Sequence, residues 1–205
     1  MQRVDQPAAE PPAGLLTPGQ QARRQRVIDA ALRLSNLREF DRIQVKDVAE
    51  EAGVALGTVY HYFSSKDHLF AEVLVAWAAT LRSNITRHPL AGTTPGERFA
   101  EVFHRSVRAF QRQPYLAKLI ARLEVSPDPY ATEILSRLGR TTDAVYRDAL
   151  DGVDPELAGA AVRVVGAVLS SVLRAWSADR MLIVDVHDRI DEAITMIFGP
   201  LPTRP

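Results

Sequence analysis

The chain has 205 residues, 46% of them hydrophobic, and its 25 basic and 25 acidic residues give a formal net charge of zero. This length allows one large domain or two small ones with a full hydrophobic core. The zero net charge argues against a protein that coats nucleic acid nonspecifically, although it permits a small local contact. Because the sequence has no cysteine, disulfides, thiolate metal ligands and cysteine nucleophiles are excluded.

No uninterrupted apolar run is long enough to span a membrane, and the first residues, MQRVDQPAAEPPAG, contain no apolar segment typical of secretion. We therefore expect a cytoplasmic protein without membrane association. Residues 1–16 are rich in Pro, Ala and Glu, which predicts a disordered arm. A helix is predicted to begin at Thr17-Pro18-Gly19-Gln20, because these residues suit the N-cap and first helical turn.

Residues 44–63 form a pattern of two short helices joined by a tight turn. Four apolar residues of the first helix share one stripe, at i, i+3, i+4 and i+7: Val45, Val48, Ala49 and Ala52. Gly53 is expected to end this helix, since glycine adopts the left-handed conformation without a Cβ penalty. In the second helix, LGTVYHYF, Val59 and Phe63 are expected to face inward. This pattern predicts a helix-turn-helix, whose second helix lies in the major groove of DNA.

The outward face of the second helix carries hydroxyl, imidazole and methyl groups that can reach phosphates or base edges. Small residues precede them, where the backbone must approach DNA closely. Ser64 followed by Asp67 predicts a capping box for the next helix, whose first-turn amides and Lys66 could hold a phosphate. The candidate DNA-binding residues are Gln44, Lys46, Ala55, Leu56, Gly57, Thr58, Tyr60, His61, Tyr62 and Lys66.

These residues resemble the DNA-binding signature of TetR-type transcriptional regulators. The resemblance rests on Val48-Ala49, Ala52-Gly53-Val54, the run from Gly57 to Phe63, Lys66 and Leu69. It covers roughly the first third of the chain and implies a DNA-binding domain at residues 17–67 and an effector-binding and dimerisation domain at residues 68–205. Arginines in the first helix then have two possible roles, as contacts to DNA phosphates or as a solvated helix face: Arg23, Arg24 and Arg26.

The rest of the chain is also predicted to be helical, so the expected fold class is all-α. Helical spacing and Pro or Gly punctuation predict helices at about 65–87, 94–114, 114–125, 129–151, 154–178 and 185–198. No stretch alternates with a period of two residues, as a strand would. In TetR-type regulators the last two helices pair with those of a second subunit, which implies a homodimer through residues 154–198. The candidate interface residues are Val165, Leu169, Val172, Ile190 and Ile194; the alternative is that both helices are core.

The middle helices are expected to enclose an effector cavity. Seven aromatic residues could form its wall, the alternative for each being ordinary core: Trp77, Phe99, Phe103, Phe110, Tyr115, Tyr146 and Trp176. Four arginines could hold an acidic ligand group, or could be solvated surface: Arg105, Arg108, Arg112 and Arg122. The segments GTVYHYFSSK and TTPGERF are also similar to the KstR-like subgroup, actinobacterial regulators of sterol and lipid breakdown. That similarity implies an effector such as an acyl-CoA thioester.

We expect neither catalysis nor a cofactor. The five histidines are scattered, and the sequence contains no HExxH motif, nucleophile elbow, phosphate-binding loop or dinucleotide fingerprint. No acidic cluster has metal-ligand spacing. The hypothesis is therefore a ligand-responsive regulator that binds a palindromic DNA operator, and the resemblance implies that it is a repressor. The alternatives are a ligand-independent DNA-binding regulator and a helical lipid-binding protein.

Overall fold

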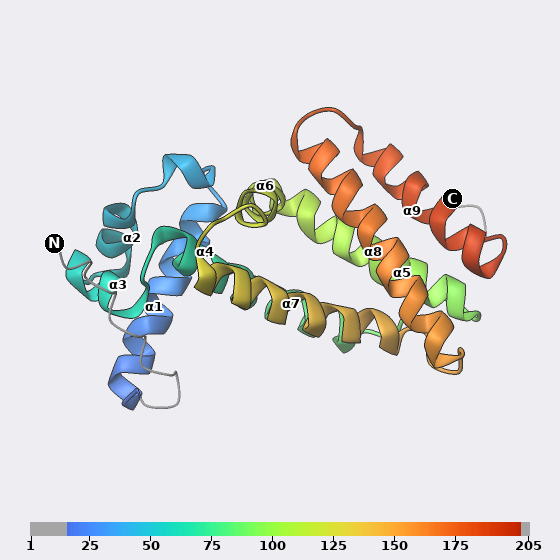
Figure 1. Ribbon diagram of the computed structural model, residues 1–205, viewed down its shortest axis with the longest axis horizontal. Helices are drawn as coiled ribbons and strands as arrows, with labels where there is room; N and C mark the ends of the chain where they lie inside the picture. Colours follow the sequence, from blue (N-terminus) through green and yellow to red (C-terminus); the bar gives the residue numbers. More distant parts are fainter. Residues whose placement is uncertain (1–15, 202–205) are drawn as a thin grey trace, which may run out of the picture.

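The computed structural model describes residues 16–201, and every regular element in that range is a helix (Figure 1). The expected all-α fold class is therefore confirmed, while the predicted arm at residues 1–16 lies almost wholly outside the described residues. In chain order the elements are α1 (Pro18–Ser35), the 3-10 turn η2 (Phe40–Arg42), α2 (Val45–Ala52), α3 (Leu56–Tyr62), α4 (Lys66–Arg87), α5 (Pro95–Arg112), α6 (Pro114–Leu123), α7 (Pro129–Asp148), α8 (Pro155–Ser177) and α9 (Ile183–Phe198).

Most helices begin where capping chemistry predicts. Thr17 accepts a hydrogen bond from the Gln20 amide, and Thr94 accepts one from the Glu97 amide, each ahead of a first-turn proline. The start of α4 differs from the prediction, because Ser65 rather than Ser64 is its N-cap and accepts from the His68 amide at 2.9 Å. The carboxylate of Asp67 consequently does not cap α4, and it accepts a hydrogen bond from Ser126 instead.

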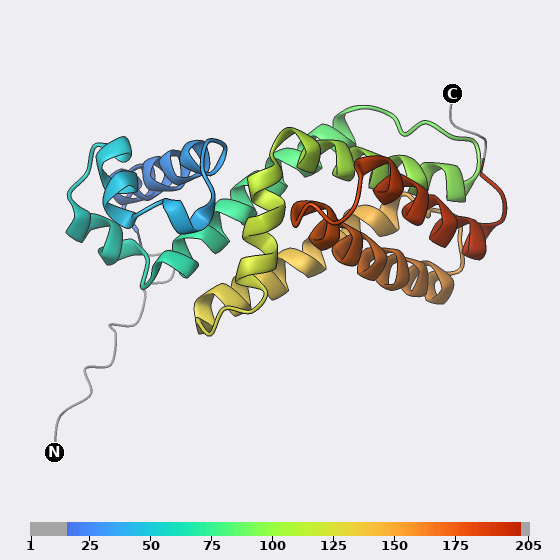
Figure 2. The same cartoon turned by 90° about the horizontal axis from the view of Figure 1, so that it is seen from above.

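The elements form an N-terminal lobe, consisting of α1, η2, α2 and α3, and a body, consisting of α5 to α9 (Figure 2). The long helix α4 belongs to both, because it packs against α1 of the lobe and against α7 of the body. Buried apolar side chains fill the centre of the lobe, among them Val27, Ala31, Ile43, Val48, Val59 and Phe63. Any movement in the body must therefore reach the lobe through α4 or through elements that touch both parts.

In the body, α4 and α7 start near each other and run in the same direction, while α9 packs against both α5 and α8. The short helix α6 crosses between lobe and body, where it contacts α4, α8 and η2 (Figure 2). The length and composition of α8 would also suit a membrane span, which the sequence reasoning did not anticipate. Apolar core helices of soluble proteins share these properties, and α8 packs against α6, α7 and α9.

Candidate DNA-binding surface and effector cavity

The turn between α2 and α3 has the predicted geometry. Gly53 adopts the left-handed conformation, with φ of 65° and ψ of 41°, and ends α2. The Val54 amide then donates to the Ala49 carbonyl at 3.0 Å, which closes the turn. After the N-cap Ala55, α3 runs for two turns with Val59 buried beneath it. The arrangement leaves the opposite side of α3 facing solvent.

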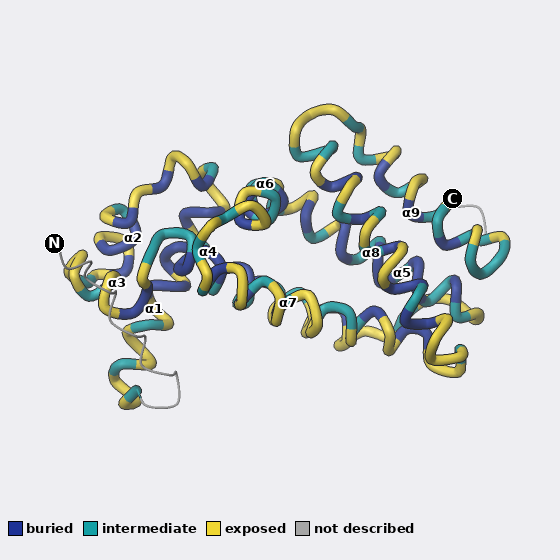
Figure 3. The backbone as a smooth tube through the Cα atoms, in the orientation of Figure 1, coloured by how far each residue is buried: buried dark blue, intermediate teal, exposed yellow. Residues whose placement is uncertain are grey.

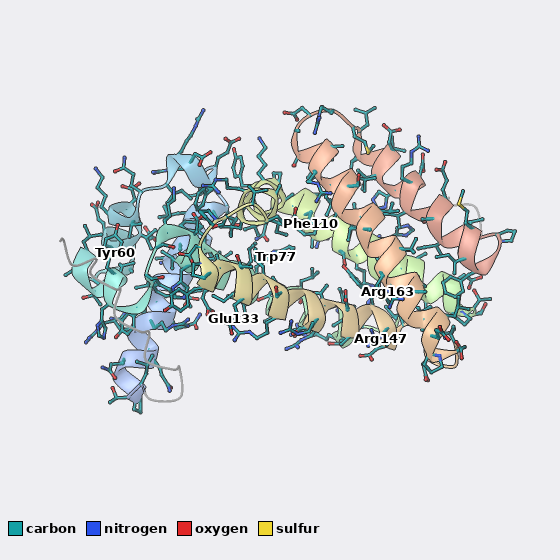
Figure 4. The ribbon with its side chains drawn as sticks, viewed as in Figure 1. Tyr60, Trp77, Phe110, Glu133, Arg147 and Arg163 are labelled. Atoms are coloured by element: carbon teal, nitrogen blue, oxygen red, sulfur yellow. The ribbon has the colours of Figure 1, made fainter. Side chains whose placement is uncertain are left out.

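That exposed side presents most of the residues predicted to contact DNA. Tyr60 is 53% exposed and lies on α3 at the far end of the lobe from the body (Figure 4). A Cβ atom added to Gly57 would meet no atom within 4 Å, so packing within the chain does not require glycine there. The other exposed candidates are Gln44, Lys46, Ala55, Leu56 and His61, with Thr58 half-buried. The surface is thus a short helix with small residues at its N-terminal end and two rings near its C-terminal end.

The prediction for Tyr62 was wrong, since only 4% of this residue is exposed. Tyr62 follows Val59 by three residues, and both i+3 and i+4 positions lie on the same face of a helix. The buried face of α3 therefore includes Tyr62 as well as Phe63, whose ring lies 6.4 Å from that of Tyr62. The ring of Tyr62 anchors α3 to the lobe.

Lys66 also differs from the prediction, because its ammonium group turns inward. Its Nζ donates a hydrogen bond of 2.5 Å to the Phe40 carbonyl oxygen and lies 3.9 Å from the centre of the Phe40 ring. Burial lowers the pKa of Lys66 below its ordinary value, although nearby carboxylates oppose that shift. In this geometry Lys66 fastens η2 to α4 and does not point toward an approaching phosphate.

The arginines of α1 take two different roles. The Arg24 guanidinium pairs with Glu72 of α4 at 2.9 Å and lies 5.1 Å from the centre of the Phe63 ring. Arg24 therefore holds α1 against α4 beside the end of α3. Arg23 and Arg26 are exposed, so either interpretation of these two arginines stays open.

Two serine–aspartate hydrogen bonds join the beginning of α4 to the segment that leads into α7. The Ser65 hydroxyl donates to the Asp128 carboxylate at 2.6 Å, and the Ser126 hydroxyl donates to the Asp67 carboxylate at 2.5 Å. Burial by itself raises the pKa of Asp128, but the hydrogen bonds from Ser65 and from two backbone amides outweigh it and keep this pKa below its ordinary value. The carboxylate is thus ionised at neutral pH, which strengthens the bond from Ser65.

Aromatic and charged contacts add to this junction. The buried His68 ring stacks on Tyr130 of α7, with ring centres 5.2 Å apart. On the other side, Lys118 of α6 pairs with Glu39 of the lobe at 2.7 Å, and this contact raises the pKa of Lys118 and lowers that of Glu39. The helix α6 therefore contacts the lobe directly, and the beginning of α7 contacts the beginning of α4.

A cavity of about 650 Å³ occupies the body between α4, α5, α6, α7 and α8. Trp77 and Phe110 border it, with ring centres 4.7 Å apart, and they lie between α7 and the helices opposite it (Figure 4). Tyr146 completes the aromatic part of the wall, and the remaining lining combines aliphatic side chains with polar and charged ones, including Glu124 and Asp143. Two arginines of α8, Arg163 and Arg174, belong to the same lining. The cavity can hold a bulky apolar molecule with an acidic group.

The other four aromatics predicted for this wall do not line the cavity. Phe99 and Phe103 are fully buried in the core, where their rings pack edge to face at 4.8 Å. Tyr115 near the start of α6 and Trp176 near the end of α8 are half-buried outside the lining. None of the four arginines considered earlier lines the cavity either, and Arg105 donates instead to the carbonyls of Ile85, His88 and Pro89. Aromatic character alone therefore could not distinguish residues that line the cavity from residues of the hydrophobic core.

The predicted dimer-contact residues also need correction, because their side chains face the interior of the protomer. Val165, Leu169 and Val172 of α8, and Ile190 and Ile194 of α9, are all buried. A different stripe of these helices is exposed and apolar, with Leu157, Val164 and Met196 at least partly open to solvent. Figure 3 shows buried and exposed turns alternating along α9, as expected for a helix with one covered side.

No cluster that could hold a metal occurs among residues 16–201. Between α5 and α9 the His104 Nε2 atom lies 2.7 Å from an Asp191 carboxylate oxygen. The His104 and His187 rings are 5.0 Å apart in an edge-to-face arrangement. This small polar group connects two helices of the body.

Comparison with known proteins identifies both parts of the chain. The family model described as "Bacterial regulatory proteins, tetR family" matches residues 27–73, and "Tetracyclin repressor-like, C-terminal domain" matches residues 92–197. The HTH-type transcriptional repressor KstR of Mycolicibacterium smegmatis is 34% identical over 88% of this chain and 89% of that protein. KstR of Mycobacterium tuberculosis is 31% identical over 88% of this chain and 82% of that protein.

A solved structure gives the same result for the fold. The crystal structure of a TetR transcriptional regulator from Rhodococcus sp. RHA1 superposes with a TM-score of 0.77 at 26% identity, covering 90% of this chain and 100% of that one. The matches with KstR repressors extend over lobe and body alike, which supports the KstR-like subgroup expected from the sequence. The chain belongs to the TetR family of bacterial transcriptional regulators, as a DNA-binding protein with a helix-turn-helix lobe and a helical regulatory body.

Proposed function

We propose that this regulator is a cytoplasmic repressor that binds a palindromic operator as a homodimer and releases it when an apolar, acyl-CoA-like effector enters the large cavity. The main support is one architectural observation about α4. This helix follows the exposed two-turn helix α3 in the chain, and it also lines the cavity of about 650 Å³. Relatives named as transcriptional repressors match along both parts. We place the boundary between the DNA-binding domain and the effector-binding and dimerisation domain between residues 67 and 68, within the first turn of α4.

The DNA contact in this proposal uses α3 and the start of α2. Tyr60, His61 and the open approach over Gly57 supply the face that enters the major groove, and Lys46 supplies a phosphate contact beside it. One such helix can read few base pairs. Two heads related by two-fold symmetry would double the contact, which is why a palindromic site fits this molecule.

The second subunit in this proposal packs on the exposed stripe of α8 and α9. Val164 is 52% exposed in the middle of α8, and small residues such as Ala160 and Ala167 lie one turn away on either side. Met196 extends the apolar surface onto α9. A stripe of small and apolar residues lets two helices approach closely, and burying it removes apolar area from water.

The effector class follows from the cavity wall. Trp77, Phe110 and aliphatic side chains suit a bulky apolar group, while Arg163 and Arg174 on α8 could hold the phosphates of a coenzyme A moiety at the edge. Arg174 is already paired with Glu124 at 2.9 Å, so Arg163 is the more available of the two. The proposed effector therefore has an apolar acyl part inside and a polyanionic part outside.

Release of DNA would be a population shift between two settings of the lobe. The cavity is bordered by α6 and α7. Lys118 of α6 bonds to Glu39 of the lobe, and Asp128 at the start of α7 bonds to Ser65 at the start of α4. A ligand that separates α6 from α7 would alter these contacts and turn α4. The two α3 helices of a dimer would then no longer match successive major grooves.

Fluorescence anisotropy with a labelled operator tests this proposal. The operator is first selected from random duplexes by the purified protein. A long-chain or steroid acyl-CoA is expected to lower DNA affinity, whereas free coenzyme A is not, and Trp77 fluorescence should report binding in the cavity. Selective DNA binding that no acyl-CoA alters would favour the ligand-independent regulator. Acyl-CoA binding without any preferred duplex would favour the lipid-binding alternative and overturn the proposed repressor.

A further inference from the structure

A second, smaller cavity lies in the groove between α4 and α7, with a volume of about 150 Å³. Apolar side chains of both helices line it, including Val75, Ala79, Ile85 and Val145. It shares part of its wall with the large cavity, since Leu81, Leu138 and Tyr146 border both. The proposed function makes no use of this groove.

Two arginines, Arg82 of α4 and Arg137 of α7, border the smaller groove. Arg137 is more than half exposed, and its guanidinium lies 4.0 Å from a Glu72 carboxylate oxygen, at the limit of an ion pair. Glu72 is largely buried and already has Arg24 at 2.9 Å. The donors of Arg137 can therefore turn to another anion at little cost to Glu72.

We propose that this groove is a second ligand site, for an amphiphile that carries one carboxylate on an unbranched apolar chain. The chain would lie between α4 and α7, and the carboxylate would pair with the Arg137 guanidinium in bidentate fashion. From Arg137 to Val145 the groove follows α7 for eight residues, or about 12 Å, which is the length of a medium-chain fatty acid. An apolar chain fits because both helices contribute aliphatic side chains to the walls.

A single carboxylate fits better than a phosphate with two charges. Arg82 comes ten residues after Glu72 on α4, so it lies about 15 Å further along the helix and cannot join Arg137 on one headgroup. One guanidinium then meets one charge, and apart from Arg82 the rest of the lining is uncharged, with aliphatic side chains and a few hydroxyl groups. This inference goes beyond the proposed function, because it requires neither DNA binding nor a particular effector in the large cavity.

The site is connected to the lobe through Glu72. A carboxylate on Arg137 would leave Glu72 with Arg24 as its ion-pair partner among the described residues, and Arg24 also lies against the Phe63 ring at the end of α3. Occupation of the groove should strengthen the pair between Arg24 and Glu72 and hold α1 more firmly on α4. A bound fatty acid would thus bias the lobe toward one setting.

Isothermal titration of the full-length protein with decanoate tests the site, with decanol as the uncharged probe. We expect decanoate to bind at one site per chain, and decanol at least ten-fold more weakly. Arg137→Gln should weaken decanoate binding about ten-fold or more, because a charge-assisted pair is lost. The matched change Arg163→Gln, at the large cavity, should leave decanoate binding unchanged.

A second pair of variants tests the location independently of charge. Ala79→Phe adds bulk to the small groove and Ala121→Phe adds it to the large cavity, since each alanine borders one cavity alone. We expect Ala79→Phe to abolish decanoate binding and Ala121→Phe to preserve it, with circular dichroism as the check on folding. Decanoate binding that Ala121→Phe or Arg163→Gln removes, or decanol binding of equal strength, would overturn the inference. DNA affinity measured on the same variants keeps this test separate from the proposed function.

Discussion

Ser65, the N-cap of α4, donates a hydrogen bond of 2.6 Å to Asp128, the N-cap of α7, although 63 positions separate them in the chain. The first turns of the two helices are therefore fastened to each other at the boundary between lobe and body. Farther along, the same two helices border both cavities. A ligand between or beside them would act on two helices that are bonded to each other at their N-terminal ends. Any change in the angle between these helices would then be centred on this hydrogen bond.

The interaction energy of this hydrogen bond can be measured with a double-mutant cycle on Ser65→Ala and Asp128→Ala. A hydrogen bond to a charged group contributes about 1.5–3 kcal/mol, so the two changes should show a coupling energy of about 1–2 kcal/mol in denaturant unfolding. Each single change also removes a helix cap, and the cycle cancels that contribution. Additive effects of the two substitutions would show that the bond between the caps does not hold the lobe.

The acid limb of the stability curve should depend on Asp128. Its pKa in the folded protein lies below the ordinary value of 3.8, because hydrogen bonds outweigh the opposing effect of burial. The stabilisation is therefore complete above that ordinary value and is lost as the pH falls through the folded pKa. Unfolding titrations of wild type and Asp128→Asn from pH 7 to about pH 2 should differ most above about pH 5 and converge in acid. Parallel curves over the whole range would contradict this assignment.

Neighbouring tyrosines on α3 provide a matched test of the DNA-binding surface. Tyr60 is exposed and Tyr62 is buried, so Tyr60→Ala should lower operator affinity about ten-fold and change the unfolding free energy by less than about 0.5 kcal/mol. Tyr62→Ala should instead destabilise the fold by about 3 kcal/mol. Anisotropy at fixed salt and urea unfolding measure the two effects. If Tyr60→Ala left operator binding intact, another face of the lobe would have to contact DNA.

The contrast between these tyrosines also shows how far sequence reasoning could go. Gly53, the prolines of the first turns and the apolar spacing of α1 and α2 predicted the lobe, because local backbone rules determine those features. The seven residues of α3 contain too few apolar positions to define the width of its buried face. Tyr62 was therefore predicted outside, and Lys66 was assigned to DNA although the Phe40 carbonyl holds it.

The helices of the body could be predicted from the sequence, but which face of each helix is buried could not. In α8 apolar residues occur on two stripes, and only the packing of α6, α7 and α9 decides which stripe is inside. Val165 was chosen for the partner and Val164 was overlooked for that reason. The junction residues Ser126 and Asp128 carried no local signal beyond a turn and a cap, since their partners in α4 are far away in sequence.

Val164 and Val165 give a second matched pair, for the proposed dimer. Val164 is 52% exposed and Val165 is fully buried, so Val164→Arg should shift the protein from dimer to monomer in analytical ultracentrifugation without loss of helicity. Val165→Ala should leave the oligomeric state unchanged and lower the unfolding free energy by about 1–2 kcal/mol. A Val164→Arg protein that sediments as a dimer would move the interface away from this stripe.

A comparison of two lysines can distinguish a structural role from a contact with DNA. The Lys66 ammonium bonds to the Phe40 carbonyl, whereas Lys46 is exposed at the start of α2. Lys66→Met keeps the aliphatic stem but loses the hydrogen bond and the cation–π contact, and it should lower the unfolding free energy by about 1 kcal/mol with operator affinity unchanged.

Lys46→Met should do the reverse, with weaker operator binding and a smaller dependence of that binding on salt, because one phosphate contact is removed. Thermal unfolding and anisotropy at several salt concentrations measure both variants. Should Lys66→Met instead reduce the salt dependence and leave stability intact, the Lys66 side chain must leave the Phe40 carbonyl when DNA binds. The η2 turn would then be released from α4 in the bound state, and the lobe would have a second setting of its own.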